Sequence, residues 1–269
     1  MFKQLLFYLF LFSTLSGLSE IQVLVSIAPQ KYLVEEIGKD QVKVQVIVPP
    51  GASSHTYEPT PKQIVAMHRG EIWFRLGENF ETRLVKVLSG IQIIDQRKGI
   101  ELMRDNCLLS KGGTDPHIWL SPKLLIIQSQ QIAEILSQYD PIHEVFYKEN
   151  LKDLEKKLHK IDEEIALLLA TAPKIILVSH PAYGYFCRDY GLTQLTIEME
   201  GREPTPYYLT DLIFKARQLE IRTVFLQKQQ SVKGGIQVAK ALGARICFLD
   251  PYVENVLSNL KVIAHAFSQ

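Results

Sequence analysis

The strongest constraint on the fold is an alternation of short apolar runs with helix-like stretches, which occurs twice along the chain. Residues 42–48, for example, alternate apolar and polar side chains until Pro49-Pro50-Gly51 ends the run, as expected of a strand. Strands are predicted at residues 21–27, 42–48, 71–76, 91–95, 174–178, 192–197, 222–226 and 245–249. Alternation of this type builds parallel sheets with helices on both faces, so the sequence predicts two α/β lobes, 20–141 and 173–269.

The segment between the two lobes has the pattern of one long amphipathic helix. Apolar residues recur at three- and four-residue steps, with Lys or Glu between them, at Leu151, Leu154, Leu158, Ile161, Ile165, Leu168 and Leu169. A helix of about 27 residues would be roughly 40 Å long, enough to run along both lobes. We therefore predict a rigid linking helix within residues 142–172. A coiled-coil dimer arm is the alternative, but the stripe covers fewer than four regular heptads, which favours packing on the chain's own lobes and a monomer.

The first 19 residues have the layout of a secretory signal. One basic residue, Lys3, precedes an apolar run at residues 5–12, and small residues at 17 and 19 place a cleavage site before Glu20. The alternative is a membrane anchor, but the run is shorter than the roughly 20 apolar residues that span a bilayer. No cysteine lies near the cleavage site, so we expect a soluble protein, periplasmic if the source has two membranes.

Composition excludes several classes of protein. The 30 Lys and Arg residues nearly balance 29 Asp and Glu residues, without the basic excess that binds a phosphate backbone, so nucleic acid is not an expected partner. The three cysteines, Cys107, Cys187 and Cys247, lack CxxC spacing and are odd in number. They predict neither a zinc ribbon nor a dense disulfide framework, and leave one disulfide open.

The seven histidines divide into two groups by their surroundings. Those on predicted helices, where a solvated side chain is the ordinary explanation, are His68, His143, His159 and His265. The other three, His55, His117 and His180, lie in loops flanked by Pro or Gly. His55 and His180 each follow a strand, one per lobe, and ligands bind outside the carboxyl ends of strands in open α/β sheets. These two side chains are thus expected to face one cleft.

Imidazole is a strong ligand for zinc and related divalent ions, so three loop histidines could form one metal site shared by both lobes. The gaps of 62 and 63 residues between them match no local zinc motif. Taken singly, each loop histidine is more often a solvent-facing side chain.

Around these histidines the sequence resembles the periplasmic solute-binding proteins of zinc and manganese ABC transporters, the cluster A-I metal receptors. The resembling segments occur in the family's order and are GASSHTYEPTP (51–61), DPHIWLSP (115–122), SHPAYGYFCRDYGL (179–192), GREPTP (201–206) and GARICFLDP (243–251). The resemblance implies two lobes joined by a rigid helix, a metal ion buried between them, and delivery to a membrane permease with its cytoplasmic ATPase.

Carried over by position, the resemblance implies that His55, His117 and His180 are metal ligands and that Asp250 supplies a carboxylate. His180 favours Zn²⁺, because manganese-type members usually have Glu there; Mn²⁺ or Fe²⁺ is the alternative cargo. Asp250 could instead cap the helix after it, since Pro251 would suit the first helical position. Glu58, Arg202 and Glu203 are expected near the ligands, and the last two could equally be an exposed pair.

Three segments depart from the family's pattern. Residues 106–114 are short and lack the long His-rich and acidic loop of many zinc receptors. Gln227-Lys228-Gln229-Gln230 stands where the family often has an acidic residue, and Tyr252-Val253 stands where Leu-Gly is usual. The last two departures concern the fourth coordination position.

Two other classes of function remain to be weighed against a metal receptor. A secreted zinc hydrolase also uses three histidines with an open fourth position, but neither HExxH nor a nucleophile elbow is present. Glu58 and Asp115 are near His55 and His117 in sequence, which keeps an enzyme conceivable. A receptor for an organic solute would need aromatic groups lining a pocket, whereas Trp73 and Trp119 lie in apolar runs typical of a core.

Overall fold

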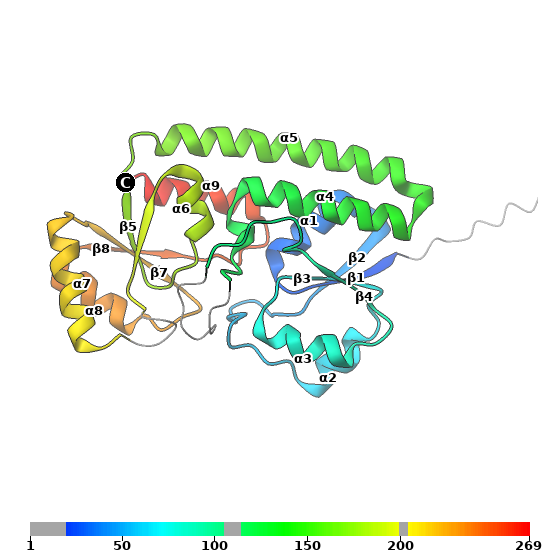
Figure 1. Ribbon diagram of the computed structural model, residues 1–269, viewed down its shortest axis with the longest axis horizontal. Helices are drawn as coiled ribbons and strands as arrows, with labels where there is room; N and C mark the ends of the chain where they lie inside the picture. The colour runs from blue at the N-terminus through cyan, green and yellow to red at the C-terminus, as the bar shows by residue number, and fades with distance from the viewer. Residues whose placement is uncertain (1–19, 105–113, 199–203) are drawn as a thin grey trace, which may run out of the picture.

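The computed structural model of the protein describes residues 20–104, 114–198 and 204–269 (Figure 1). The predicted signal segment lies outside the described residues, as do Cys107, Arg202 and Glu203. The described chain forms two sheets, each of four parallel strands flanked by helices, which confirms the predicted two-lobed α/β fold. The boundaries proposed for the lobes stay a prediction.

The N-terminal sheet has the order β2-β1-β3-β4 and every neighbouring pair is parallel. Its strands are β1 (Ile21–Val25), β2 (Val42–Val46), β3 (Ile72–Arg75) and β4 (Gln92–Asp95). One face carries α1 (Ala28–Gly38) and α4 (Pro122–Tyr139), and the other carries α2 (Pro61–Met67) and α3 (Asn79–Val87) (Figure 1). Short 3₁₀ helices occur at Lys39–Gln41, Ile118–Leu120 and Pro141–His143.

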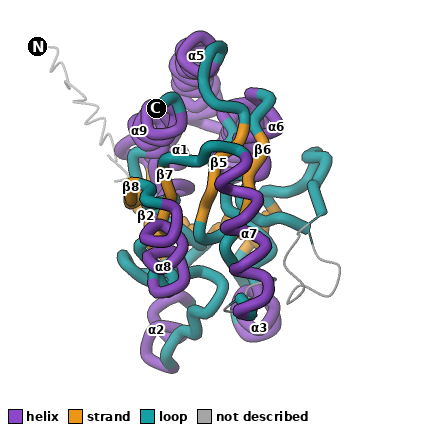
Figure 2. Tube along the Cα trace, turned by 90° about the vertical axis from the view of Figure 1, so that its left-hand side faces the viewer, coloured by secondary structure: helices purple, strands orange, loops and turns teal. Residues whose placement is uncertain are grey.

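The C-terminal sheet repeats this topology with the order β6-β5-β7-β8. Its strands are β5 (Ile175–Val178), β6 (Thr193–Thr196), β7 (Thr223–Gln227) and β8 (Arg245–Leu249). Its helices are α6 (Gly184–Tyr190), α7 (Pro206–Gln218), α8 (Lys233–Leu242) and α9 (Val256–Phe267). Figure 2 views the molecule from this lobe, with α7 and α8 lying side by side.

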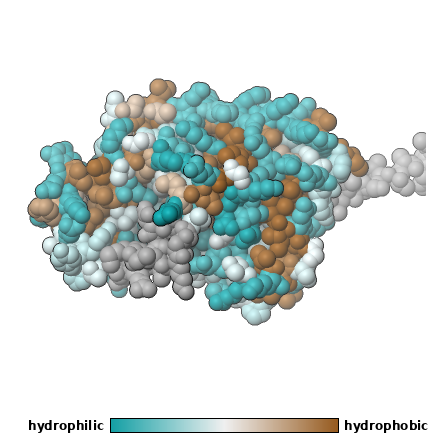
Figure 3. Space-filling model, in the orientation of Figure 1, coloured by the Kyte–Doolittle hydropathy of each residue, from teal (hydrophilic) through white to brown (hydrophobic). Residues whose placement is uncertain are grey.

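The predicted linking helix is α5 (Glu144–Leu169), whose 26 residues give a length of about 39 Å. Its apolar stripe is buried against α1 and α4 of the first lobe and against α6 and α9 of the second. Its outer side is mainly hydrophilic in the view of Figure 3, as its Lys and Glu residues require. The helix therefore packs on the chain's own lobes.

The hydrophobic core is continuous from one lobe to the other. One cluster runs from the N-terminal sheet through α4 and α5 to α6 and α9, and a smaller one fills the space between the C-terminal sheet, α7 and α8. Trp73 and Trp119 are fully buried, as predicted for core residues. The two lobes, between which the site described below lies, are therefore held together by one shared hydrophobic core along α5.

The sequence left one disulfide open. Among the described residues, Cys187 and Cys247 are both free thiols, and burial raises the pKa of Cys187 to about 12. Within the same residues, none of the helices combines the length and apolar character needed to cross a bilayer.

Candidate metal site

His55 lies in the loop that follows β2. The backbone of this loop first continues the sheet, because the N–H groups of Ile47 and Val48 donate to carbonyls of Val25 and Ser26. Pro49 and Pro50 then end the ladder, and Gly51 adopts a φ of 81°, a left-handed conformation that glycine tolerates best. Ser53 and Ser54 follow as buried residues, so His55 is carried inward rather than into solvent.

His117 lies between Pro116 and the 3₁₀ helix Ile118–Leu120. Asp115 fixes it twice, since one carboxylate oxygen accepts both the His117 backbone N–H at 2.9 Å and the ring Nδ1 at 2.7 Å. His117 is 3% exposed.

His180 follows the carboxyl end of β5, as predicted. The preceding residue, Ser179, extends the pairing with β7 through its N–H to the carbonyl of Phe225, and its hydroxyl accepts the N–H of Gln227. His180 thus leaves the sheet at β5, an inner strand whose backbone is paired on both sides.

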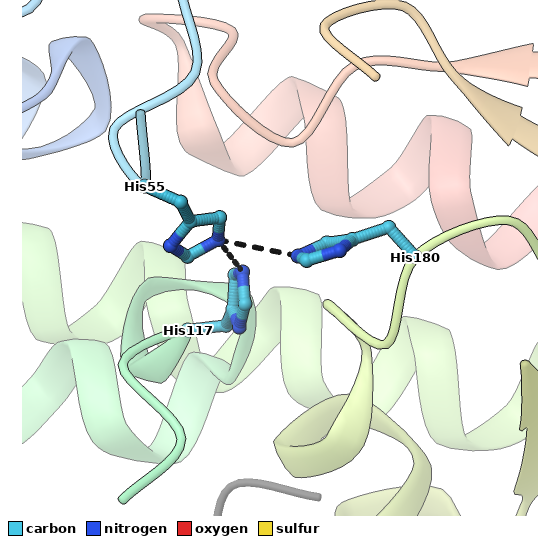
Figure 4. Close-up of side chains that lie close together, drawn as sticks. All are labelled: His55, His117 and His180. Carbon is cyan, nitrogen blue, oxygen red and sulfur yellow. Dashed lines mark hydrogen bonds between the residues drawn. The ribbon is translucent and has the colours of Figure 1, made fainter. Parts of the chain in front are cut away.

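The three imidazoles converge on one point (Figure 4). The Nε2 atom of His55 lies 3.2 Å from Nε2 of His117 and 3.2 Å from Nε2 of His180. Their ligand atoms all lie within 4.8 Å of one another. Two imidazole nitrogens bound to a tetrahedral Zn²⁺ at 2.0–2.1 Å would be about 3.3 Å apart, so two of the three spacings already match such a site.

A carboxylate supports each ring from behind. Nδ1 of His55 lies 3.1 Å from Glu78, Nδ1 of His117 lies 2.7 Å from Asp115, and Nδ1 of His180 lies 2.6 Å from Glu198. An ionised carboxylate only accepts hydrogen bonds, so each Nδ1 carries the proton and each Nε2 keeps its lone pair for a metal ion. Together the three carboxylates supply negative charge behind the rings, which offsets the charge of a divalent cation.

Two pKa shifts agree with this arrangement. Burial lowers the pKa of His180, a change that the hydrogen bond to Glu198 opposes and that the neighbouring histidines reinforce, so the ring is neutral at pH 7. Burial disfavours the ionised carboxyl of Glu78, but its electrostatic interaction and hydrogen bond with the His55 ring, together with the hydrogen bond from the Ser54 hydroxyl, outweigh burial and lower the pKa of Glu78. The His180 ring is therefore deprotonated, as a metal ligand must be, and the Glu78 carboxylate is ionised, as an acceptor of the His55 Nδ1 proton must be.

Glu78 and Glu198 were missed in the sequence, and Asp115 was considered only as a neighbour of His117. A signal was present: Glu78 follows β3 and Glu198 follows β6, so both lie at carboxyl ends of strands, where His55 and His180 also lie.

Asp250 lies outside the histidine cluster. Among the described residues, the group of potential ligands within 4.8 Å of one another consists of the three histidines. The carboxylate of Asp250 accepts the N–H of Tyr252 at 2.8 Å, and it lines a cavity of about 340 Å³ between the lobes. The alternative role as a helix cap is wrong, because α9 begins at Val256 and its N-cap is Asn255, whose side chain accepts the N–H of Ser258.

The other expected neighbours of the ligands have different positions. Glu58 is exposed and forms an ion pair with Arg83 at 3.1 Å. Arg202 and Glu203 lie outside the described residues. Of the remaining histidines, His68, His159 and His265 are exposed and His143 bonds to Asp140, as expected for side chains outside a metal site.

Comparison with known proteins identifies the family. Residues 23–262 match the family described as zinc-uptake complex component A, periplasmic (ZnuA). A protein of Chlamydia trachomatis named as a putative metal-binding protein is 36% identical over 250 residues, which are 92% of this chain and 90% of that protein. The crystal structure of ZnuA superimposes with a TM-score of 0.89 at 35% identity, over 93% of this chain and 98% of that one.

More distant relatives carry the names of two metals. The high-affinity zinc uptake system protein ZnuA of Bacillus subtilis is 25% identical over 84% of this chain and 76% of its own length. The manganese ABC transporter substrate-binding lipoprotein PsaA of Streptococcus pneumoniae is 28% identical over 80% of this chain and 74% of its own length. The chain therefore belongs to the ZnuA family of metal-binding receptors for ABC transporters, and is a receptor and not an enzyme.

Proposed function

We propose that this protein binds one Zn²⁺ ion between its lobes and delivers it to an ABC permease for uptake. The observation that supports this most strongly is the convergence of three Nε2 atoms, with 3.2 Å spacings on both sides of His55 and a carboxylate behind every ring. The ion is the transported cargo, and His55, His117 and His180 are its proposed ligands.

The ligand set favours zinc over manganese. Imidazole nitrogen suits Zn²⁺, whereas Mn²⁺ prefers more oxygen ligands. In this chain every donor atom of the described cluster is a nitrogen. A manganese receptor is the second candidate, because the relatives named above include one for each metal.

We assign the fourth position of the shell to Asp250. It follows β8, at the same edge of the C-terminal sheet as His180, and a carboxylate would complete a tetrahedral shell of three nitrogens and one oxygen. To ligate, its carboxylate would exchange the bond to the Tyr252 N–H for one to the ion.

The place of this receptor in transport follows from the same proposal. Export by the N-terminal segment would put the protein in the periplasm as a monomer, where it would load zinc and dock on a membrane permease driven by a cytoplasmic ATPase. The relative named as a manganese ABC transporter substrate-binding lipoprotein supports such partners.

Metal analysis of protein purified without added metal, followed by competition between Zn²⁺ and Mn²⁺, tests this function. We expect one zinc ion per chain and displacement of Mn²⁺ by Zn²⁺. His180→Glu exchanges a nitrogen for an oxygen ligand and should move the preference toward Mn²⁺, whereas the same change at exposed His159 should not. A preference of the unaltered protein for Mn²⁺ would overturn the zinc assignment.

A further inference from the structure

We infer that Tyr252 is a positioning residue for the ligand His55, acting from the other lobe through Ser54 and Glu78. This inference rests on the proposed function, since it concerns how one proposed ligand is held. Tyr252 itself lies two residues after Asp250, in the segment that joins β8 to α9.

A chain of hydrogen bonds connects the two residues. The Tyr252 hydroxyl lies 2.9 Å from Ser54 Oγ, Ser54 Oγ lies 2.6 Å from Glu78 Oε1, and Glu78 Oε2 lies 3.1 Å from His55 Nδ1. Ser54 is fully buried and Glu78 is 3% exposed, so water does not compete for these bonds.

The direction of each bond follows from the number of protons. Glu78 only accepts when ionised, so Ser54 uses its one proton toward Glu78. The hydroxyl of Tyr252 must then be the donor to Ser54. Removal of the phenol proton leaves Ser54 Oγ without this donor, so the Ser54 hydroxyl, and with it the Glu78 carboxylate that it holds behind the His55 ring, is less firmly positioned.

Tyr252 is itself held against the first lobe. The carbonyl of the preceding residue, Pro251, accepts the indole N–H of Trp119 at 2.8 Å, and the ring centroids of Trp119 and Tyr252 are 5.6 Å apart. The ring centroid of Trp119 also lies 5.1 Å from the ring centroid of His117. The phenol therefore has one defined place between the lobes, and it couples the position of the segment after β8 to the orientation of His55.

The substitution Tyr252→Phe removes the hydroxyl and keeps the ring. Second-layer partners of metal ligands typically contribute 10- to 100-fold in affinity, and a group one bond further away should contribute less, about fivefold. We expect Zn²⁺ affinity to fall by that factor and the visible spectrum of the Co²⁺-loaded protein to change. Tyr190→Phe is the matched control, because it removes a hydroxyl bonded to Asp162 at 2.7 Å, away from the histidines.

A double-mutant cycle with Ser54→Ala separates this relay from simple packing. Once Ser54 is replaced, Tyr252→Phe should cause no further loss of Zn²⁺ affinity, because the chain is already broken. Two losses that multiply independently would overturn the inference, as would an unchanged Zn²⁺ affinity and Co²⁺ spectrum in Tyr252→Phe alone.

Nitrogen-15 NMR of the histidine rings in metal-free protein gives a readout that does not depend on the cargo. The His55 Nδ1 resonance, assigned by its loss in His55→Gln, should shift in Tyr252→Phe and stay in place in Tyr190→Phe. An unmoved resonance would overturn the inference even where zinc binds as proposed. A shifted resonance in a protein that binds no zinc would keep the relay and reject the proposed function.

Discussion

The two lobes contribute unequally to the histidine cluster. The N-terminal lobe supplies His55 and His117, whose Nε2 atoms are 3.2 Å apart, together with Glu78 and Asp115 behind them. The C-terminal lobe supplies His180 with Glu198 behind it. Two of the ligands therefore come from one lobe, whereas the third ligand comes from the sheet of the other.

The supporting carboxylates are also more deeply buried in the N-terminal lobe than in the C-terminal lobe. Glu78 and Asp115 have side chains that are 3% and 8% exposed, whereas Glu198 is 18% exposed. Charged hydrogen bonds are stronger where water is excluded. The comparison indicates a prepared half-site in the first lobe that the second lobe completes.

Removing a histidine should have the largest effect on Zn²⁺ binding, and the size of the loss should differ between the two lobes. A ligand that binds only the folded state adds RT ln(1 + [L]/Kd), about 2.7 kcal/mol at a hundredfold excess over Kd. Ala at position 55, 117 or 180 should remove most of this gain in thermal melts with Zn²⁺. His180→Ala should keep the most residual affinity in titration calorimetry, because the prepared pair His55 and His117 remains.

Exposed His159 provides the control, and His159→Ala should show the full zinc-dependent shift. Equal shifts in all four variants would reject the site. Equal residual affinity in the three ligand variants would keep the site but remove the distinction between the lobes.

Neutralising a supporting carboxylate should have the next largest effect. Gln keeps the shape of Glu but lacks the charge that fixes the Nδ1 proton, and changes of this kind cost about 10- to 100-fold in metal affinity. Glu78→Gln should weaken Zn²⁺ binding more than Glu198→Gln, since Glu78 is the more buried of the two. Competition titration measures both, with exposed Glu58→Gln as the control.

If Glu58→Gln weakened Zn²⁺ binding as much as Glu78→Gln or Glu198→Gln, the loss of affinity would come from the change in overall charge and not from the hydrogen bonds to the rings. Should Glu198→Gln prove the more damaging change, the second lobe would be the more demanding half of the site.

The fold followed from the sequence because its signals are local. The alternation at residues 42–48 and the apolar steps of the linking helix depend on neighbours a few residues away, and both elements occur where predicted. The loop histidines were also recognisable, since His55 and His180 follow strands whose carboxyl ends bind ligands in such folds.

The supporting carboxylates were not recognisable in the same way. Glu78 and Glu198 also follow strands, but that position does not show which ring each carboxylate faces, and the pairing of β3 and β6 in their sheets places them behind His55 and His180. The position of Asp250 depends on one local bond to the N–H of Tyr252, which periodicity does not encode. Local pattern therefore identified the elements and the ligand candidates, but not the contacts between segments far apart in sequence.

Changing Asp250 should have a smaller effect than changing a histidine or Glu78. Three carboxylates already offset the charge of the ion, and Asp250 must leave its turn before it can ligate. We expect Asp250→Asn to reduce Zn²⁺ affinity about tenfold in titration calorimetry, in line with loss of one anionic ligand partly replaced by water. Unchanged affinity would leave Asp250 with its role in the turn at residues 250–252.

The smallest expected effect is on the pH dependence of the metal-free protein, and it concerns the second lobe. Because burial lowers the pKa of His180 from 6.5, the folded state resists protonation that the unfolded chain accepts. The free energy of unfolding should therefore decline as the pH falls through 6.5, and level off once the pH is below the folded pKa.

Urea unfolding of metal-free protein at pH 7.5 and pH 5 isolates this contribution when His180→Gln is compared with the unaltered chain. Gln does not titrate, so the stability of the unaltered protein relative to His180→Gln should drop between the two pH values. The exposed site His159→Gln should show no such change. If the difference in stability between the unaltered protein and His180→Gln were the same at both pH values, His180 would bind its proton equally well in the folded and unfolded states. Burial would then not separate the ligand of the second lobe from His55, whose side chain is 23% exposed.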